Sequence, residues 1–226
     1  MPGGTLTTLT TTFTSMMTAV DLAAAVVFAI TGALVASRKQ MDVVGFMWLG
    51  VVTGVGGGTV RDLLLGVPVF WVRDASPVIA CLVASVAVHF TAHLVEYRYR
   101  LILWLDALGL ALVTVAGTAK GIDAGAGPVV AVVMGVITGS VGGIIRDILG
   151  HEPSIILRRE IYVTASVVGA VVYVAAGSLG IDRTLAAAAG FLTVLAVRGF
   201  AIGFGWSMPV YRPRAGRDAS NLDASG

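Results

Sequence analysis

The sequence predicts an all-α polytopic membrane protein with seven transmembrane helices, and two observations support this fold class. Hydrophobic residues make up 57% of the 226 residues and charged residues only 12%, which is too little polar surface to cover a water-soluble globule. The apolar residues also fall into seven runs, each near the roughly 20 residues that a helix needs to cross the hydrocarbon core. These runs lie at about 19–37, 43–66, 76–95, 101–119, 128–150, 161–180 and 185–207.

The segments outside the runs are short and polar. Residues 1–18 are rich in threonine, and we expect them to form a loose tail outside the membrane. Residues 208–226 are expected to form a polar C-terminal tail. The joints between the runs are too short to hold a soluble domain, so residues 19–207 are expected to form a single transmembrane domain.

An internal repeat is the most specific feature of the sequence. The residues at about 19–95 match those at about 101–180 without gaps, most densely where GVVTGVGGGTVRDLLLG is followed later by GVITGSVGGIIRDILG. Each unit holds three spans, an odd number, so the second unit enters the membrane upside down relative to the first. The sequence therefore predicts an inverted 3+3 repeat, to which an extra helix at about 185–207 is added.

Glycines interrupt the second and fifth runs at matching positions. Glycine disfavours helix, so we expect the second and fifth helices to be broken there, with carbonyl groups left without intrahelical partners. A break inside a membrane needs a lining of protein or water, which predicts a polar pathway between the two helices. The alternative is that these glycines only let helices pack closely.

An arginine–aspartate pair follows each glycine-rich element, as Arg61-Asp62 and Arg146-Asp147. A charged side chain at the bilayer centre costs about 2.5–3.5 kcal/mol on insertion scales, so these four need partners or water. Neighbouring residues on a helix point about 100° apart. We therefore expect each arginine to pair with the aspartate of the other repeat. The alternative places these charges at the membrane interface, as helix ends.

Three further charged residues are candidates for the mouth of a pathway. Asp21 and Asp106 begin their spans, where a carboxylate also favours a helix N-terminus, and Lys120 ends the fourth span. Lysine and arginine are concentrated in the joints and in the tail on the side of the C-terminus. The positive-inside rule therefore predicts that the N-terminus is outside the cell and the C-terminus is cytoplasmic.

Several classes of function are not expected. The formal net charge of +2 is small and the basic residues are scattered, which argues against nucleic acid as a partner. His89 and His93 are four residues apart and could share a metal, but no further ligands lie nearby, so a metal site is not expected. The sequence holds no catalytic triad or paired-carboxylate acid/base site. We therefore expect neither an enzyme nor a protein with a cofactor.

The elements GVGGGTVRD and GSVGGIIRD, repeated in three-helix units with a seventh helix after them, resemble the prokaryotic TRIC family of trimeric intracellular cation channels. The resemblance covers about residues 19–207. It implies a homotrimer in the cell (inner) membrane, in contact with membrane lipids. It further implies that each protomer has its own pore between the kinked second and fifth helices, permeable to potassium or sodium.

The resemblance also implies which residues line that pore. The glycines form the kinks, and three hydroxyl residues are candidate pore hydroxyls. Together with the two charged pairs, the candidate pathway residues are Thr53, Gly56, Gly57, Gly58, Arg61, Asp62, Thr138, Ser140, Gly142, Gly143, Arg146 and Asp147. Related prokaryotic sequences are also labelled as transporters, so the alternative function is secondary transport of glycine or another small neutral amino acid.

Overall fold

The structure is a computed structural model that describes residues 3–94, 98–152 and 161–206, and every regular element in these ranges is helical. The elements in chain order are α1 (Gly3–Arg38), α2 (Val43–Leu64), α3 (Phe70–Arg73), α4 (Ser76–Thr91), a 3₁₀ turn (Ala92–Leu94), α5 (Arg98–Asp123), α6 (Pro128–Leu149), α7 (Val163–Ser178) and α8 (Arg183–Phe204). The all-α prediction is therefore confirmed for the described residues.

The long helices are apolar enough to cross a membrane. Six described helices meet this condition by length and composition, namely most of α1, then α2, α4 with its 3₁₀ turn, α5, α6 and α8. The remaining predicted span falls on α7, which is apolar but has only 16 residues. A seventh crossing therefore stays a prediction.

Local sequence signals set several helix ends. Asp42 precedes α2 and its carboxylate accepts a hydrogen bond from the Gly45 backbone N–H at 2.8 Å, which satisfies one donor of the first turn. Asp182 caps α8 in the same way. Pro128 begins α6, at a position where its missing N–H has no consequence. Gly205 ends α8 with a φ of 67°, a left-handed conformation that glycine adopts without strain.

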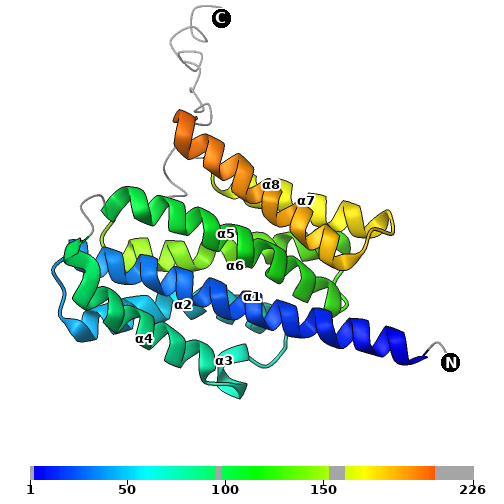
Figure 1. The fold of residues 1–226 in the computed structure, drawn as a ribbon, viewed down its shortest axis with the longest axis horizontal. Coiled ribbons are helices and arrows are strands. Elements are labelled where there is room, and N and C mark those ends of the chain that lie inside the picture. Colours follow the sequence, from blue (N-terminus) through cyan, green and yellow to red (C-terminus); the bar gives the residue numbers. More distant parts are fainter. Residues whose placement is uncertain (1–2, 95–97, 153–160, 207–226) are drawn as a thin grey trace, which may run out of the picture.

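The helices of the two sequence repeats pack in matching ways. In the first, α1, α2 and α4 contact one another; in the second, α5, α6 and α7 do so. The two sets meet where α1 contacts α5 and where α2 contacts α6. Figure 1 shows α1 and α5 side by side and running in opposite directions, while α8 covers the second set through α5 and α7.

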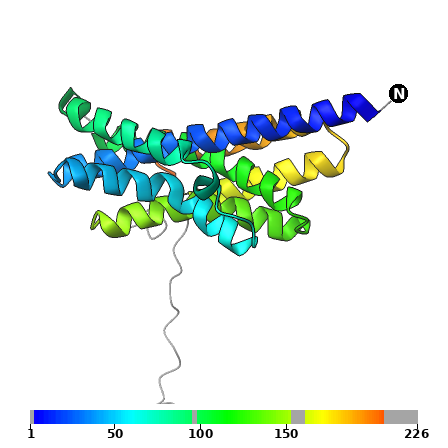
Figure 2. The same cartoon turned by 90° about the horizontal axis from the view of Figure 1, so that it is seen from below.

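The prediction of a loose N-terminal tail is wrong for residues 3–18. These residues continue α1, which extends past the other helices at its N-terminal end (Figure 1, Figure 2). Threonine is only a modest helix former, but extending an existing helix is much easier than starting one. Phe13, which is 6% exposed, also packs with the start of α8 and secures this turn. The predicted tail of residues 208–226 lies outside the described residues.

The prediction that the second and fifth helices are broken at glycines is also wrong. Both α2 and α6 are α-helical without interruption, and none of their internal glycines has a positive φ. Each glycine lowers helix stability by about 1 kcal/mol relative to alanine. An unpaired backbone group in the hydrocarbon core costs several kcal/mol, and this greater cost keeps both helices continuous.

Candidate ion pathway

The helices α2 and α6 touch backbone to backbone at their glycines. A Cβ atom added to Gly57 would lie 2.1 Å from the carbonyl oxygen of Thr138. A Cβ atom added to Gly142 would lie 2.7 Å from the carbonyl oxygen of Thr53. Any side chain at these two positions would push the helices apart. The glycines therefore act by close approach, which was the packing alternative, and the contact closes the space between α2 and α6 at this level.

The other three glycines of the pathway set face side chains first, and not the backbone of the opposite helix. A Cβ atom at Gly56 would meet only the end of the Ile145 side chain, at 3.0 Å. A Cβ atom at Gly143 would lie 3.3 Å from the Tyr162 hydroxyl, and one at Gly58 would lie 2.6 Å from the ring of Phe70. These positions are near the contact of α2 with α6 without forming it.

The candidate pore hydroxyls do not face this contact. Thr53 is 1% exposed and its Oγ1 donates to the Leu49 carbonyl at 2.6 Å, while a Cβ atom at Gly32 of α1 would lie 2.7 Å from the same Oγ1. Thr138 has the matching arrangement in the second repeat: its Oγ1 donates to the Met134 carbonyl within α6 and lies against Gly117 of α5. The two carbonyl oxygens, and not the hydroxyls, face the glycine contact.

Ser140 is the third candidate hydroxyl. Its Oγ donates to the Val136 carbonyl at 2.7 Å, within α6. The side chain is 7% exposed, so it is nearly as enclosed as the two threonines.

A cluster of four charges lies on one side of the glycine contact. Arg61 is fully buried, and its guanidinium group donates to Asp62 at 2.8 Å and to Asp21 at 3.0 Å. Lys120 reaches across from α5 and pairs with Asp62 at 2.9 Å. The backbone N–H of Phe70, in α3, donates to the other oxygen of Asp62 at 2.9 Å. Two cations therefore balance two carboxylates.

A second cluster lies on the other side of the contact and repeats the first. Arg146 is 1% exposed and donates to Asp106 at 2.7 Å, and it pairs with Asp147 at 2.9 Å. The same guanidinium also donates to the Thr31 hydroxyl at 3.1 Å. In both clusters the arginine joins the aspartate next to it in the chain with an aspartate 40 residues earlier, which lies within the preceding long helix and not at its start.

The expected pairing between repeats is therefore wrong. Arg61 pairs with Asp62 and Asp21, and Arg146 pairs with Asp147 and Asp106. The 100° angle between neighbouring residues describes where their side chains leave the helix. It does not fix where the guanidinium group of an arginine lies. The long side chain can bend so that this group donates to the carboxylate of the next residue.

The two clusters are not equivalent. The position that matches Lys120 in the first repeat is Val35, whose side chain lies beside Gly150. The second cluster thus has no lysine. Arg198 of α8, which is 1% exposed, lies instead over the ring of Tyr162 at 5.1 Å, and the Tyr162 hydroxyl donates to the Gly139 carbonyl. Sequence reasoning did not place these two residues at the site, although a lone arginine within an apolar span was a signal for Arg198.

A cavity of about 460 Å³ opens beside the first cluster. Asp21 and Lys120, two of the candidate mouth residues, line it together with the ion pair of Asp123 and Arg183. Asp106, the third candidate, is fully buried and lies in the second cluster. The structure therefore places two of the candidate mouth residues at this cavity and the third inside the bundle. Within the described ranges, no three His, Cys, Asp or Glu residues gather as metal ligands.

Comparison with known proteins connects this arrangement to one family. The model of a family described as "Glycine transporter" matches residues 18–93 and 103–178, so it matches once in each repeat. The UPF0126 inner membrane protein YadS of Escherichia coli strain K12 is 43% identical over 197 residues, which cover 84% of this chain and 94% of that protein. A UPF0126 membrane protein of Vibrio cholerae is 37% identical over 203 residues, covering 88% and 84%.

Solved structures share the fold. The TRIC trimeric intracellular cation channel orthologue from Rhodobacter sphaeroides has a TM-score of 0.83 and 50% identity, covering 85% of this chain and all of that one. A second TRIC cation channel structure has a TM-score of 0.77 and 33% identity, covering 87% and 98%. The resemblance seen in the two glycine-rich elements is confirmed: the chain is a multi-pass membrane protein that belongs to the prokaryotic TRIC family.

Proposed function

We propose that the protein is a potassium-permeable monovalent cation channel. In this proposal it forms a homotrimer in the prokaryotic inner membrane, with one pore per protomer between α2 and α6. The names of the relatives support the cation channel, the trimer and the inner membrane, since solved members are cation channels, one is a trimeric channel orthologue, and YadS is an inner membrane protein. The proposed orientation, with the N-terminus outside and the C-terminus cytoplasmic, comes from the positive-inside rule.

The observation that carries the proposal is that the two buried clusters of arginine and aspartate lie on opposite sides of the glycine contact between α2 and α6. Arg61 lies four residues after Gly57 on α2, and Arg146 lies four residues after Gly142 on α6. Because these helices meet at the glycines, each arginine cluster lies roughly 6 Å along its helix from the contact. Carboxylates therefore stand on both sides of one narrow point. Buried charges of this kind in a membrane protein mark ion pathways.

The glycine contact is the point at which such a pathway would open. The carbonyl oxygens of Thr53 and Thr138 face the opposite helix there. A carbonyl oxygen has two lone pairs, so it can bind a cation while keeping its helical hydrogen bond. In our proposal α2 and α6 separate at Gly57 and Gly142 during conduction, and these oxygens replace part of the hydration shell of potassium or sodium.

Secondary transport of glycine or another small neutral amino acid is the second candidate, because the matching family model is described as "Glycine transporter". Recording from purified protein in planar bilayers separates the two. The channel proposal expects unitary currents in potassium chloride that do not need an amino acid. Saturable glycine uptake into proteoliposomes, with no unitary current, would refute the channel and support the transporter.

A further inference from the structure

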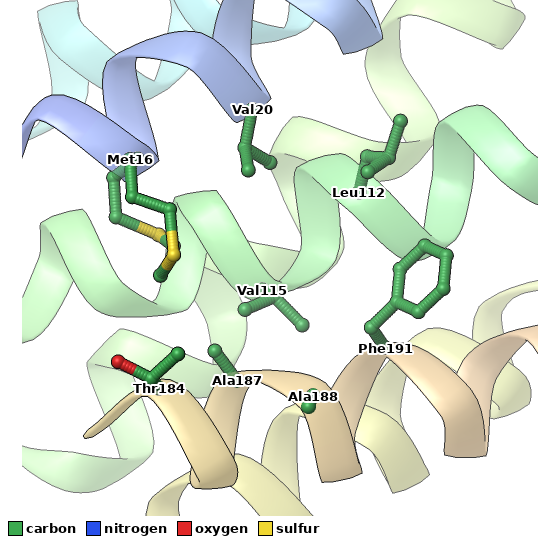
Figure 3. Close-up of a pocket in the computed structure, with 9 residues that line it drawn as sticks. Met16, Val20, Leu112, Val115, Thr184, Ala187, Ala188 and Phe191 are labelled. Atoms are coloured by element: carbon green, nitrogen blue, oxygen red, sulfur yellow. The ribbon is translucent and has the colours of Figure 1, made fainter. Parts of the chain in front are cut away.

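A groove with an apolar floor and a charged end runs along α1, α5 and α8. Its apolar part is a cavity of about 240 Å³, lined by side chains such as Met16, Val20, Leu112, Ala188 and Phe191 (Figure 3). Its charged end is the cavity of about 460 Å³ described above. The two cavities share Met17.

On α5 and α8 the charged end lies nearer to the helix ends than the apolar part does, while on α1 the two parts lie at about the same level. On α5, Lys120 lies eight residues beyond Leu112, and on α8, Arg183 lies eight residues before Phe191. Eight residues of helix correspond to about 12 Å. One leaflet of the hydrocarbon core is roughly 15 Å deep. The groove therefore has polar groups where lipid head groups lie and apolar groups where acyl chains lie.

The charged end is balanced in sign. Arg183 pairs with Asp123, and these side chains are 43% and 46% exposed. The Lys120 side chain is 32% exposed. Its ammonium group has three N–H donors, and the bond to Asp62 uses one of them, so two remain for a ligand. A phosphate could accept from Arg183 and Lys120, while an ammonium group beside it could donate to Asp123.

We propose that this groove binds one phospholipid with a zwitterionic ethanolamine head group, from the leaflet on the side of the α1 N-terminus. The phosphate contacts Lys120 and Arg183, the ammonium group contacts Asp123, and one acyl chain lies between Met16 and Phe191. An empty apolar groove of this size would lose dispersion contacts along its whole length, and a lipid chain restores them. This inference does not depend on the proposed channel activity.

The test uses the purified full chain, native mass spectrometry and three lipids with the same acyl chains: phosphatidylethanolamine, phosphatidylglycerol and diacylglycerol. Ala188 is exposed and lines the groove, so Ala188→Phe fills the groove without entering the core. Displacing even two buried methylenes should weaken binding by about tenfold or more. Ala87→Phe, on an exposed position of α4 away from the groove, is the matched control.

We expect phosphatidylethanolamine to bind more tightly than the other two lipids, Ala188→Phe to weaken that binding, and Ala87→Phe to leave it unchanged. Arg183→Gln should abolish the preference over diacylglycerol. Ala188→Leu, a smaller change, repeats the test if the phenylalanine variant does not fold. The proposal is overturned if both phenylalanine variants behave alike, or if phosphatidylglycerol binds best. It is also overturned if Ala188→Phe changes the oligomer mass and not the bound lipid, because a second copy of the chain would then fill the groove.

Discussion

Replacing Gly57 with alanine tests the contact between α2 and α6. The new Cβ atom would lie 2.1 Å from the Thr138 carbonyl oxygen, whereas ordinary contact begins at 3.4 Å, so the backbones must separate by more than about 1 Å. Overpacking of this kind costs about 1–3 kcal/mol. Alanine recovers about 1 kcal/mol through its better helix propensity. The net expected loss of stability relative to the wild type is therefore about 0–2 kcal/mol.

Gly56→Ala is the matched control, because its Cβ atom would meet only the flexible end of Ile145, at 3.0 Å. The helix-propensity gain is the same, so this variant should be as stable as the wild type or slightly more stable. The two variants therefore differ by the overpacking cost alone, about 1–3 kcal/mol. Thermal unfolding in detergent should place Gly57→Ala roughly 2–12 °C below Gly56→Ala. In planar bilayers, Gly57→Ala should raise the open probability, since its helices are already held apart. Equal unfolding temperatures and equal open probabilities for the two variants would refute the described contact.

The charged residues lead to three further predictions. Asp106→Asn or Arg146→Gln alone should destabilise the protein by about 3–5 kcal/mol, since each removes one member of a buried ion pair. The double variant should recover part of this loss in thermal unfolding, and strictly additive losses would exclude the pairing. Lys120→Gln should change stability by less than about 1 kcal/mol, as its side chain is partly exposed. The same change should increase cation current more at low than at high salt, and a salt-independent effect would place Lys120 away from the pathway. A C-terminal fluorescent reporter should be active only when it remains in the cytoplasm, and activity that requires export would reverse the predicted orientation.

The sequence predicted the positions of the membrane helices well, because apolar runs of this length have few other solutions. The run at 43–66 corresponds to α2, which spans Val43–Leu64, and the run at 128–150 corresponds to α6. The short helix α3 was not predicted. It is placed by tertiary contacts, such as the hydrogen bond from the Phe70 N–H to Asp62, which no local pattern reveals.

The candidate site was predicted in composition and not in geometry. The glycines, threonines and charges of the two repeats do lie together, but the reasons differ from those expected. Glycine propensity predicted breaks, whereas the membrane keeps Gly57 and Gly142 in continuous helices. The angle between neighbouring side chains also predicted that Arg61 would not pair with Asp62, yet the two are hydrogen-bonded. That angle gives the direction in which a side chain leaves the helix and not the distance that it spans.

In the proposed function, ions pass between α2 and α6 within one protomer. Gly56 is half-buried beside Ile145 of α6, and cysteine there can be tested with a positively charged thiol reagent during single-channel recording. Cys81, the one natural cysteine, is replaced by alanine in this background. We predict that modification of Gly56→Cys stops or reduces the unitary current, while modification of Ala87→Cys on the exposed face of α4 does not. A unitary current of unchanged size after complete modification of Gly56→Cys, verified by mass, would contradict a pathway between these helices.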